Sequence, residues 1–124
     1  MIETLAIALG GAVGALLRYW TSTGVYSLLG RDFPYGTLVV NVLGSLLMGI
    51  LTILMLERMS VGPEMRGALL IGLLGAFTTF STFSMETLFL LEQGELFRAS
   101  LNVLISVVVC IGAAWFGVKI GRII

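Results

Sequence analysis

The chain has 124 residues, of which 58% are hydrophobic and 11% charged, and its formal net charge is zero. Soluble domains typically carry roughly 25% charged residues, so this composition favours an integral membrane protein. Histidine is absent, which removes the usual metal ligand and the usual acid–base residue. The single cysteine, Cys110, excludes an internal disulfide and a multi-thiolate metal site. The balanced charge gives no reason to expect a nucleic-acid partner.

Four apolar stretches are each long enough to cross a membrane, which takes about 20 residues. The first stretch lacks a basic region before it, so we interpret it as a membrane helix and not as a removed signal peptide. Polar or glycine-containing segments separate the stretches and predict short turns. The sequence therefore predicts a single all-α membrane domain over residues 1–124, with transmembrane helices at about 4–29, 36–56, 66–91 and 96–120.

The charges that orient membrane helices are nearly balanced between the two sides. Four helices place both termini and the middle loop on one side, with Arg58, Arg66, Lys119 and Arg122. The other side receives Arg31 and Arg98, and also Arg18 if that side chain reaches it. This weak bias leads to the hypothesis that the chain inserts in both orientations and pairs as an antiparallel homodimer.

The third stretch contains a run of hydroxyl groups, because five of the seven residues from Thr78 to Ser84 are serine or threonine. Hydroxyls compete with the helix for backbone hydrogen bonds, and the run lies near the centre of the stretch. We therefore predict a helix broken at the bilayer midplane, starting near Gly75. Such breaks are tolerated where the backbone lines a cavity or is buried in protein. The freed carbonyl oxygens could hold a small cation.

Two other stretches carry polar residues spaced four apart, which places each set on one helical face. The first set is Thr37, Asn41 and Ser45, and the second is Asn102, Ser106 and Cys110. The simpler interpretation is hydrogen bonding between helices. The alternative is a polar path through the membrane, in which an amide such as Asn41 supplies donors.

Aromatic and ionisable residues within the stretches allow two interpretations each. Phe77, Phe80 and Phe83 could form an apolar contact stripe, or their electropositive ring edges could line a path for a small anion. Arg18 could extend to the membrane interface or lie at a pore mouth. Glu86 could pair with an arginine, face a vestibule or carry protons.

Three segments together resemble the small fluoride channel family, Fluc, also called CrcB. They are residues 14–19, the segment Gly36-Thr37-Leu38-Val39-Val40-Asn41-Val42-Leu43-Gly44-Ser45, and residues 72–86 with their Thr-Thr-Phe-Ser-Thr-Phe core. The resemblance implies a dual-topology antiparallel homodimer with two fluoride pathways. It also implies a structural sodium ion, which is not transported, at the dimer centre.

The resemblance further implies roles for individual residues. Backbone carbonyls of Gly75 and Thr78 would hold the sodium ion, while Arg18 and Glu86 would belong to the vestibule. Cys110 would fall on the polar track but departs from the hydroxyl expected there. The implied fluoride pathway comprises Asn41, Phe80, Phe83, Ser81, Thr82, Thr79, Thr37 and Ser106.

Three functions are candidates for this sequence. The first is a passive fluoride channel in the bacterial inner (plasma) membrane, which exports fluoride from the cytoplasm and has no catalytic residues. The second is a small proton-coupled four-helix exporter of multiple drugs or organic cations, for which Glu86 is the embedded carboxylate. The third is a membrane subunit that only packs against a partner, which does not explain the hydroxyl run.

Overall fold

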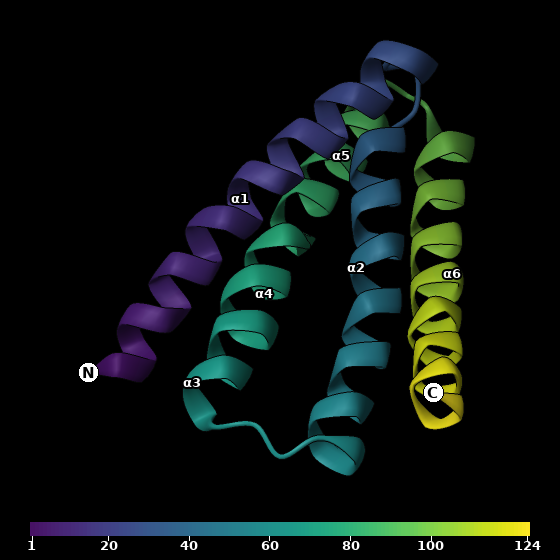
Figure 1. The fold of residues 1–124 in the computed structure, drawn as a ribbon. Helices are drawn as coiled ribbons and strands as arrows, with labels where there is room; N and C mark the ends of the chain where they lie inside the picture. Colours follow the sequence, from purple (N-terminus) through teal and green to yellow (C-terminus); the bar gives the residue numbers. More distant parts are fainter.

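The computed structural model describes all 124 residues and is entirely helical. Four helical spans are long and apolar enough to cross a membrane, and each end lies within three residues of the range expected from the sequence. The spans are Ile2–Leu29, Tyr35–Arg58, Pro63–Glu92 and Leu96–Ile123. Both termini and the loop between the second and third spans lie at the lower end of the molecule in Figure 1.

The first and last spans are each one helix, whereas the two middle spans are composite. Helix α1 covers Ile2–Leu29 and α6 covers Leu96–Ile123. In the second span, α2 (Tyr35–Ile53) continues into a π-helical turn, η1 (Leu54–Arg58). The third span consists of α3 (Pro63–Arg66), the π-helical η2 (Gly67–Leu73), α4 (Leu74–Phe77) and α5 (Phe80–Glu92).

The third span is extended at two residues between α4 and α5. Thr78 has φ −84° and ψ 158°, and Thr79 has φ −152° and ψ 119°. Thr79 is the N-cap of α5, and its Oγ1 accepts a hydrogen bond from the Thr82 N–H at 3.2 Å. Gly75, where we expected the irregular backbone to start, lies inside α4. The non-helical residues are thus threonines, whose side chains can cap a new helix.

On the side opposite the termini, the spans are connected by short turns that contain a glycine in the left-handed backbone conformation. Gly30 follows α1 with φ +85°, and Gly94 lies between α5 and α6 with φ +79°. Glycine adopts this conformation without the steric cost that a Cβ atom would bring. The turns allow consecutive spans to run antiparallel, as Figure 1 shows.

Glycines allow two pairs of spans to pack backbone against backbone. A Cβ atom added at Gly10 or Gly14 of α1 would overlap the carbonyl oxygens of Ala68 and Leu73 in η2. On the other side of the molecule, a Cβ atom at Gly49 of α2 would overlap the Ala114 carbonyl of α6. Small residues at such contacts are typical of membrane helices. Helix α1 is therefore held against the third span, and α2 against α6.

We predict that Gly14→Ala lowers stability by about 1–3 kcal/mol, because the added methyl group must displace the Leu73 backbone. The matched control is Gly24→Ala in the same helix, where an added Cβ atom meets nothing within 4 Å. The measurement is the thermal midpoint of the purified protein in detergent, followed by size-exclusion chromatography after heating. Equal midpoints for the two variants would contradict the close packing of α1 on η2.

Candidate functional site

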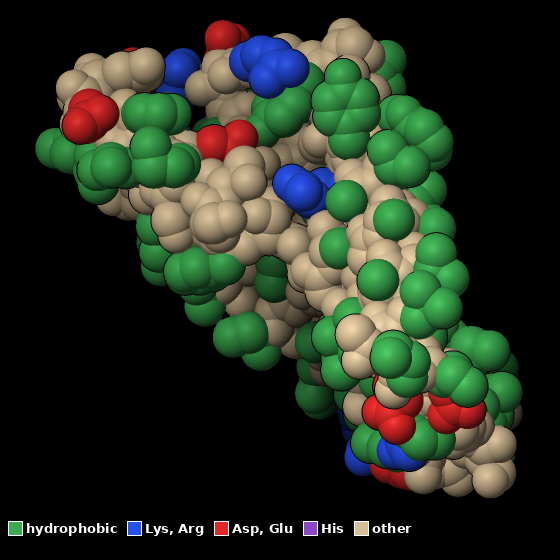
Figure 2. Space-filling view, turned by 90° about the vertical axis from the view of Figure 1, so that its left-hand side faces the viewer, with side chains coloured by type: hydrophobic (Ala, Val, Ile, Leu, Met, Phe, Trp, Pro, Cys, Tyr) green, Lys and Arg blue, Asp and Glu red, His purple; other side chains and the backbone are tan.

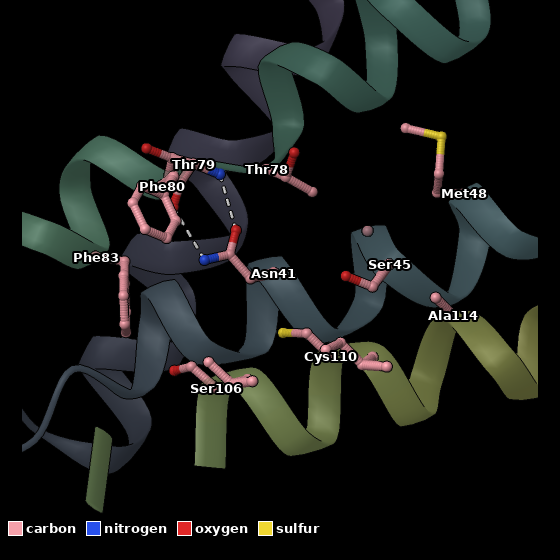
Figure 3. A pocket seen from close by; sticks show the side chains of 13 residues that line it. Asn41, Ser45, Met48, Thr78, Thr79, Phe80, Phe83, Ser106, Cys110 and Ala114 are labelled. Atoms are coloured by element: carbon pink, nitrogen blue, oxygen red, sulfur yellow. Dashed lines mark hydrogen bonds between the residues drawn. The ribbon is translucent and has the colours of Figure 1, made fainter. Parts of the chain in front are cut away.

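A cavity of about 390 Å³ lies beside the extended residues and between α2, α5 and α6. Figure 3 shows Asn41 and Ser45 of α2 on one side of it, with Ser106 and Cys110 of α6 nearby. None of its lining residues is charged. Its lining combines amide, hydroxyl, thiol and aromatic groups, from Asn41, Ser45, Thr78, Thr79, Phe80, Phe83, Ser106 and Cys110.

The cavity brings together five of the eight residues that the family resemblance assigns to the fluoride pathway: Asn41, Thr79, Phe80, Phe83 and Ser106. The other three, Thr37, Ser81 and Thr82, are not part of its lining. The Thr82 side chain instead contacts Thr79, the N-cap residue of α5, whose hydroxyl donates to Thr82 Oγ1 at 3.1 Å. Ser81 is exposed on the surface of the single chain.

The side-chain amide of Asn41 binds both polar groups of the Thr79 backbone. Asn41 Nδ2 donates to the Thr79 carbonyl at 3.0 Å, and the Thr79 N–H donates to Asn41 Oδ1 at 2.8 Å. Figure 3 draws both bonds. The amide therefore acts like a neighbouring strand, since it satisfies a backbone donor and acceptor that the helix has released. Asn41 Nδ2 keeps a second hydrogen that these bonds do not use.

The two phenylalanines at the start of α5 are in contact but differ in exposure. Their ring centroids are 5.3 Å apart and the rings are inclined by 45°. Phe80 is 77% exposed, whereas Phe83 is only 9% exposed. Phe77 does not continue their line as we had expected, because it belongs to α4 and the extended residues intervene. The aromatic pair is thus confined to the first turn of α5.

Glu86 lies in a second cavity, of about 420 Å³, near the turn that follows α1. The Tyr26 hydroxyl donates to Glu86 Oε2 at 2.8 Å, while Glu86 Oε1 is buried without a hydrogen-bond partner. The guanidinium of Arg31 lies over the Tyr26 ring, 4.4 Å from its centroid. Thr37 is adjacent, with its Oγ1 3.5 Å from the Tyr26 hydroxyl oxygen.

Sequence reasoning missed the role of Tyr26 in this second cavity. The only local signal was a phenolic hydroxyl near the end of the first span, and its partner Glu86 is 60 positions away in the sequence. Arg98 and Asp32 also line this cavity. Glu86 is therefore close to several charged groups at one end of the molecule and distant in the chain from most of them.

Arg18 is not among the residues that line either cavity. Its Nε donates a hydrogen bond to the backbone carbonyl of Ala76 in α4, at 3.0 Å. From the sequence, Arg18 is expected either at the membrane interface or in a vestibule with Glu86. The structure places its guanidinium against the third span, two residues before the extended backbone.

A polar ladder on α6 extends from the first cavity towards α5. Asn102 Nδ2 donates to Thr87 Oγ1 at 2.9 Å, and the Ser106 hydroxyl donates to Asn102 Oδ1 at 3.4 Å. Asn102 is 2% exposed. Part of the stripe expected on the fourth span therefore serves hydrogen bonding between helices, while Ser106 and Cys110 also line the cavity.

Charged side chains are scarce along the middle of the molecule. Figure 2 shows that, on the face it presents, most Lys, Arg, Asp and Glu side chains lie towards the two ends. The four spans between them are long enough and apolar enough to cross a membrane. This distribution is typical of a multi-pass membrane protein.

Comparison with known proteins relates this site to a family. The family described as CrcB-like protein, Camphor Resistance (CrcB), matches residues 5–118. Relatives named "Fluoride-specific ion channel FluC" come from Methylococcus capsulatus (57% identical), Coxiella burnetii (54%) and Geobacter sulfurreducens (52%), each aligned over 98% of this chain. The chain spans 53% of the length of the Methylococcus relative and 98% of the other two.

The match extends over all four spans and includes both cavities. Identity of more than half of the positions, along nearly the whole chain, adds to the family match. The chain therefore belongs to the CrcB family of membrane proteins.

Proposed function

We propose that this protein is a passive, fluoride-selective channel in the bacterial inner membrane, which lets fluoride leave the cytoplasm. The observation that carries the proposal is the uncharged cavity in which Asn41, Thr79, Phe80, Phe83 and Ser106 come together. Relatives that are more than half identical to this chain are named fluoride-specific ion channels. No step of covalent chemistry is required, and the proposed role is not enzymatic.

The cavity is suited to a small anion that must be bound weakly enough to leave again. Fluoride is small and strongly hydrated, so each water that it loses must be replaced by a donor. The second Nδ2 hydrogen of Asn41 is the free candidate donor. The hydroxyls of Thr79 and Ser106 would donate to fluoride by giving up their bonds to Thr82 Oγ1 and Asn102 Oδ1. The electropositive edges of Phe80 and Phe83 complete the proposed path without adding a full positive charge.

The first-turn N–H groups of α5 add to this environment. A helix leaves its first N–H groups without intrahelical acceptors, and its N-terminus carries a partial positive charge. Helix α5 begins at Phe80, next to the cavity. In the proposed path, Ser81 and Thr82 contribute to this first turn, and Thr37 continues the polar surface towards the cavity of Glu86. Glu86 would influence the potential near one end of the path, and Arg18 would do so from its position beside the end of α4.

We further propose that two copies pair in antiparallel orientation. Residues 78–79 lie near the middle of the 30-residue third span, so the extended backbone would lie near the bilayer midplane. In a single chain, Ser81, Ser84 and Phe80 are exposed at this level. Hydroxyls and irregular backbone facing lipid are costly. A second copy would cover them, and the weak charge bias permits both orientations.

A sodium ion at the centre of such a dimer fits the backbone of this segment. The Thr79 N–H, which would bond the Gly75 carbonyl in a continuous helix, donates to Asn41 instead. The Thr82 N–H, which would bond the Thr78 carbonyl, donates to Thr79 Oγ1. The carbonyl oxygens of Gly75 and Thr78 therefore receive no hydrogen bond from the N–H groups that would bind them in a continuous helix. Oxygen ligands of this kind suit a hard cation, which would hold the two copies together.

The alternative function, proton-coupled export of organic cations, depends on Glu86. The buried and unpartnered Oε1 of Glu86 is the one observation in its favour. However, the Glu86 cavity is separate from the cavity beside the extended backbone, since no residue lines both. The names of the relatives also favour the channel.

We predict that Phe80→Ile and Phe83→Ile each reduce fluoride efflux from proteoliposomes at least about tenfold, because isoleucine keeps an apolar side chain at the position but lacks a ring edge. The control is Phe97→Ile, since Phe97 is also 77% exposed but lies on α6 outside the cavity. Size-exclusion chromatography verifies that each variant assembles normally. Unchanged efflux in both cavity variants would remove the aromatic-edge mechanism.

We predict that a C-terminal tag is found on both sides of the membrane in one cell population. The measurement pairs a reporter that is active only inside the cell with one that is active only outside. Adding several lysines to the C-terminus should fix one orientation, because positive charges remain on the cytoplasmic side. Because all copies of this variant then have the same orientation, the variant expressed alone should form no antiparallel dimer and should be inactive. A single location for the unmodified protein would contradict dual topology.

We predict that replacing sodium with a bulky organic cation during purification and reconstitution weakens the dimer and lowers fluoride efflux. Restoring sodium should recover both, because the proposed site binds the ion through backbone oxygens. The measurements are subunit exchange between differently labelled protomers and fluoride efflux. If dimer stability and efflux are both indifferent to sodium, the proposed cation site is wrong.

A further inference from the structure

Arg18 lies in α1 on the face that packs against the third span. Gly10 and Gly14 bring the α1 backbone against Ala68 and Leu73, and Arg18 is one turn beyond Gly14. The same face of α1 therefore contacts η2 through glycines and then contacts α4 through an arginine. The close packing of the glycines places the guanidinium beside the end of α4.

The carbonyl that Arg18 binds belongs to the last turn of α4. In a continuous helix, the Ala76 carbonyl would accept from the N–H of Phe80, four residues later. The extended residues Thr78 and Thr79 remove this option, because Phe80 starts a new helix. Arg18 Nε replaces the missing donor at 3.0 Å. The carbonyl is thereby satisfied within the protein.

Arg18 makes no salt bridge in the structure, whose two ion pairs join Arg98 with Glu95 and Arg122 with Glu57. Its one hydrogen bond is the bond to Ala76. A charged residue within a membrane span is costly and therefore points to a specific use. Here the guanidinium is directed at the backbone of the segment that borders the cavity and not at the cavity itself.

Two helices hold the interrupted segment between them. From α2, Asn41 binds the N–H and carbonyl of Thr79. From α1, Arg18 binds the carbonyl of Ala76, three residues earlier. Together the two side chains bind the backbone at Ala76, just before the extended residues, and at Thr79, the second of them. We propose that Arg18 is a positioning residue, whose Nε–H holds the Ala76 carbonyl and thereby keeps residues 75–79 in the conformation that the fluoride pathway requires.

The hydrogen bond of Arg18 and its positive charge can be removed separately by substitution. Glutamine places an amide nitrogen at the position of Nε, counted along the side chain, and so keeps the donor without the charge. Methionine places a methyl group there and removes both. Lysine keeps the charge but puts a methylene at that position and its ammonium one atom further out. The three substitutions therefore distinguish a positioning donor from a source of positive potential.

The test measures two quantities on Arg18→Gln, Arg18→Met and Arg18→Lys. The first is hydrogen exchange at the amides of Thr79 and Thr82, which donate to Asn41 and Thr79. The second is fluoride efflux from proteoliposomes. The matched control is Arg66→Met, because Arg66 lies in the same span as Ala76 and its side chain makes no hydrogen bond or salt bridge. Amides of α6 provide an internal reference for exchange.

We expect Arg18→Met to accelerate exchange at these two amides by about tenfold and to lower efflux by a similar factor, since it leaves a backbone acceptor unpaired. Arg18→Gln should remain close to the unmodified protein in both measurements, and Arg18→Lys should behave more like the methionine variant. If lysine preserves and glutamine abolishes efflux, the charge is what matters and the inference is wrong. Unchanged exchange in the methionine variant would also overturn it.

The efflux measurement rests on the proposed function, whereas the hydrogen-exchange measurement does not. If the unmodified protein releases no fluoride, the proposed function fails, and exchange at Thr79 and Thr82 still decides the role of Arg18. If the unmodified protein releases fluoride and all three variants match it in both measurements, the proposed function stands and the positioning role is rejected.

Discussion

The pair of hydrogen bonds between the Asn41 amide and the Thr79 backbone is the interaction on which the rest of the site depends. A membrane provides no water to satisfy backbone groups that leave a helix, so a protein group must replace each lost bond. Asn41 replaces two of them at once, at 3.0 and 2.8 Å. Without this contact, two extended residues in the middle of an apolar span would leave a buried donor and acceptor unpaired, at a cost of about 1–3 kcal/mol each.

The extended backbone in turn determines what surrounds it. Because Thr79 caps α5, Phe80 and Phe83 fall on the first turn of a new helix and face a cavity together with Ser106 and Cys110 of α6. The close packing of α2 on α6 through Gly49 brings these two helices near enough to share the cavity. On the opposite side, the glycines of α1 allow Arg18 to reach Ala76. Glycines thus allow the helices to pack closely, and a few polar side chains bind the backbone of the extended segment.

The four spans and their turns could be predicted from the sequence, because hydropathy and turn residues are local signals. The hydroxyl run also indicated irregular backbone in the third span, although the extended residues are Thr78 and Thr79 and Gly75 remains helical. That difference has a long-range cause, since the partner of Thr79 is 38 positions away. The contacts of Arg18 with Ala76 and of Tyr26 with Glu86 span 58 and 60 positions. Helical periodicity cannot reveal such pairs, because it describes one element at a time.

The central claim is that the uncharged cavity beside the extended segment conducts fluoride and excludes other halides. Its most direct test is efflux from proteoliposomes that contain the unmodified protein and are loaded with potassium fluoride or potassium chloride. A potassium ionophore balances the charge, and ion-selective electrodes follow the external anion. The account predicts rapid release of fluoride, dependent on the ionophore, and no release of chloride above that of protein-free liposomes. Equal release of both anions, or no release of fluoride from correctly folded protein, would contradict it.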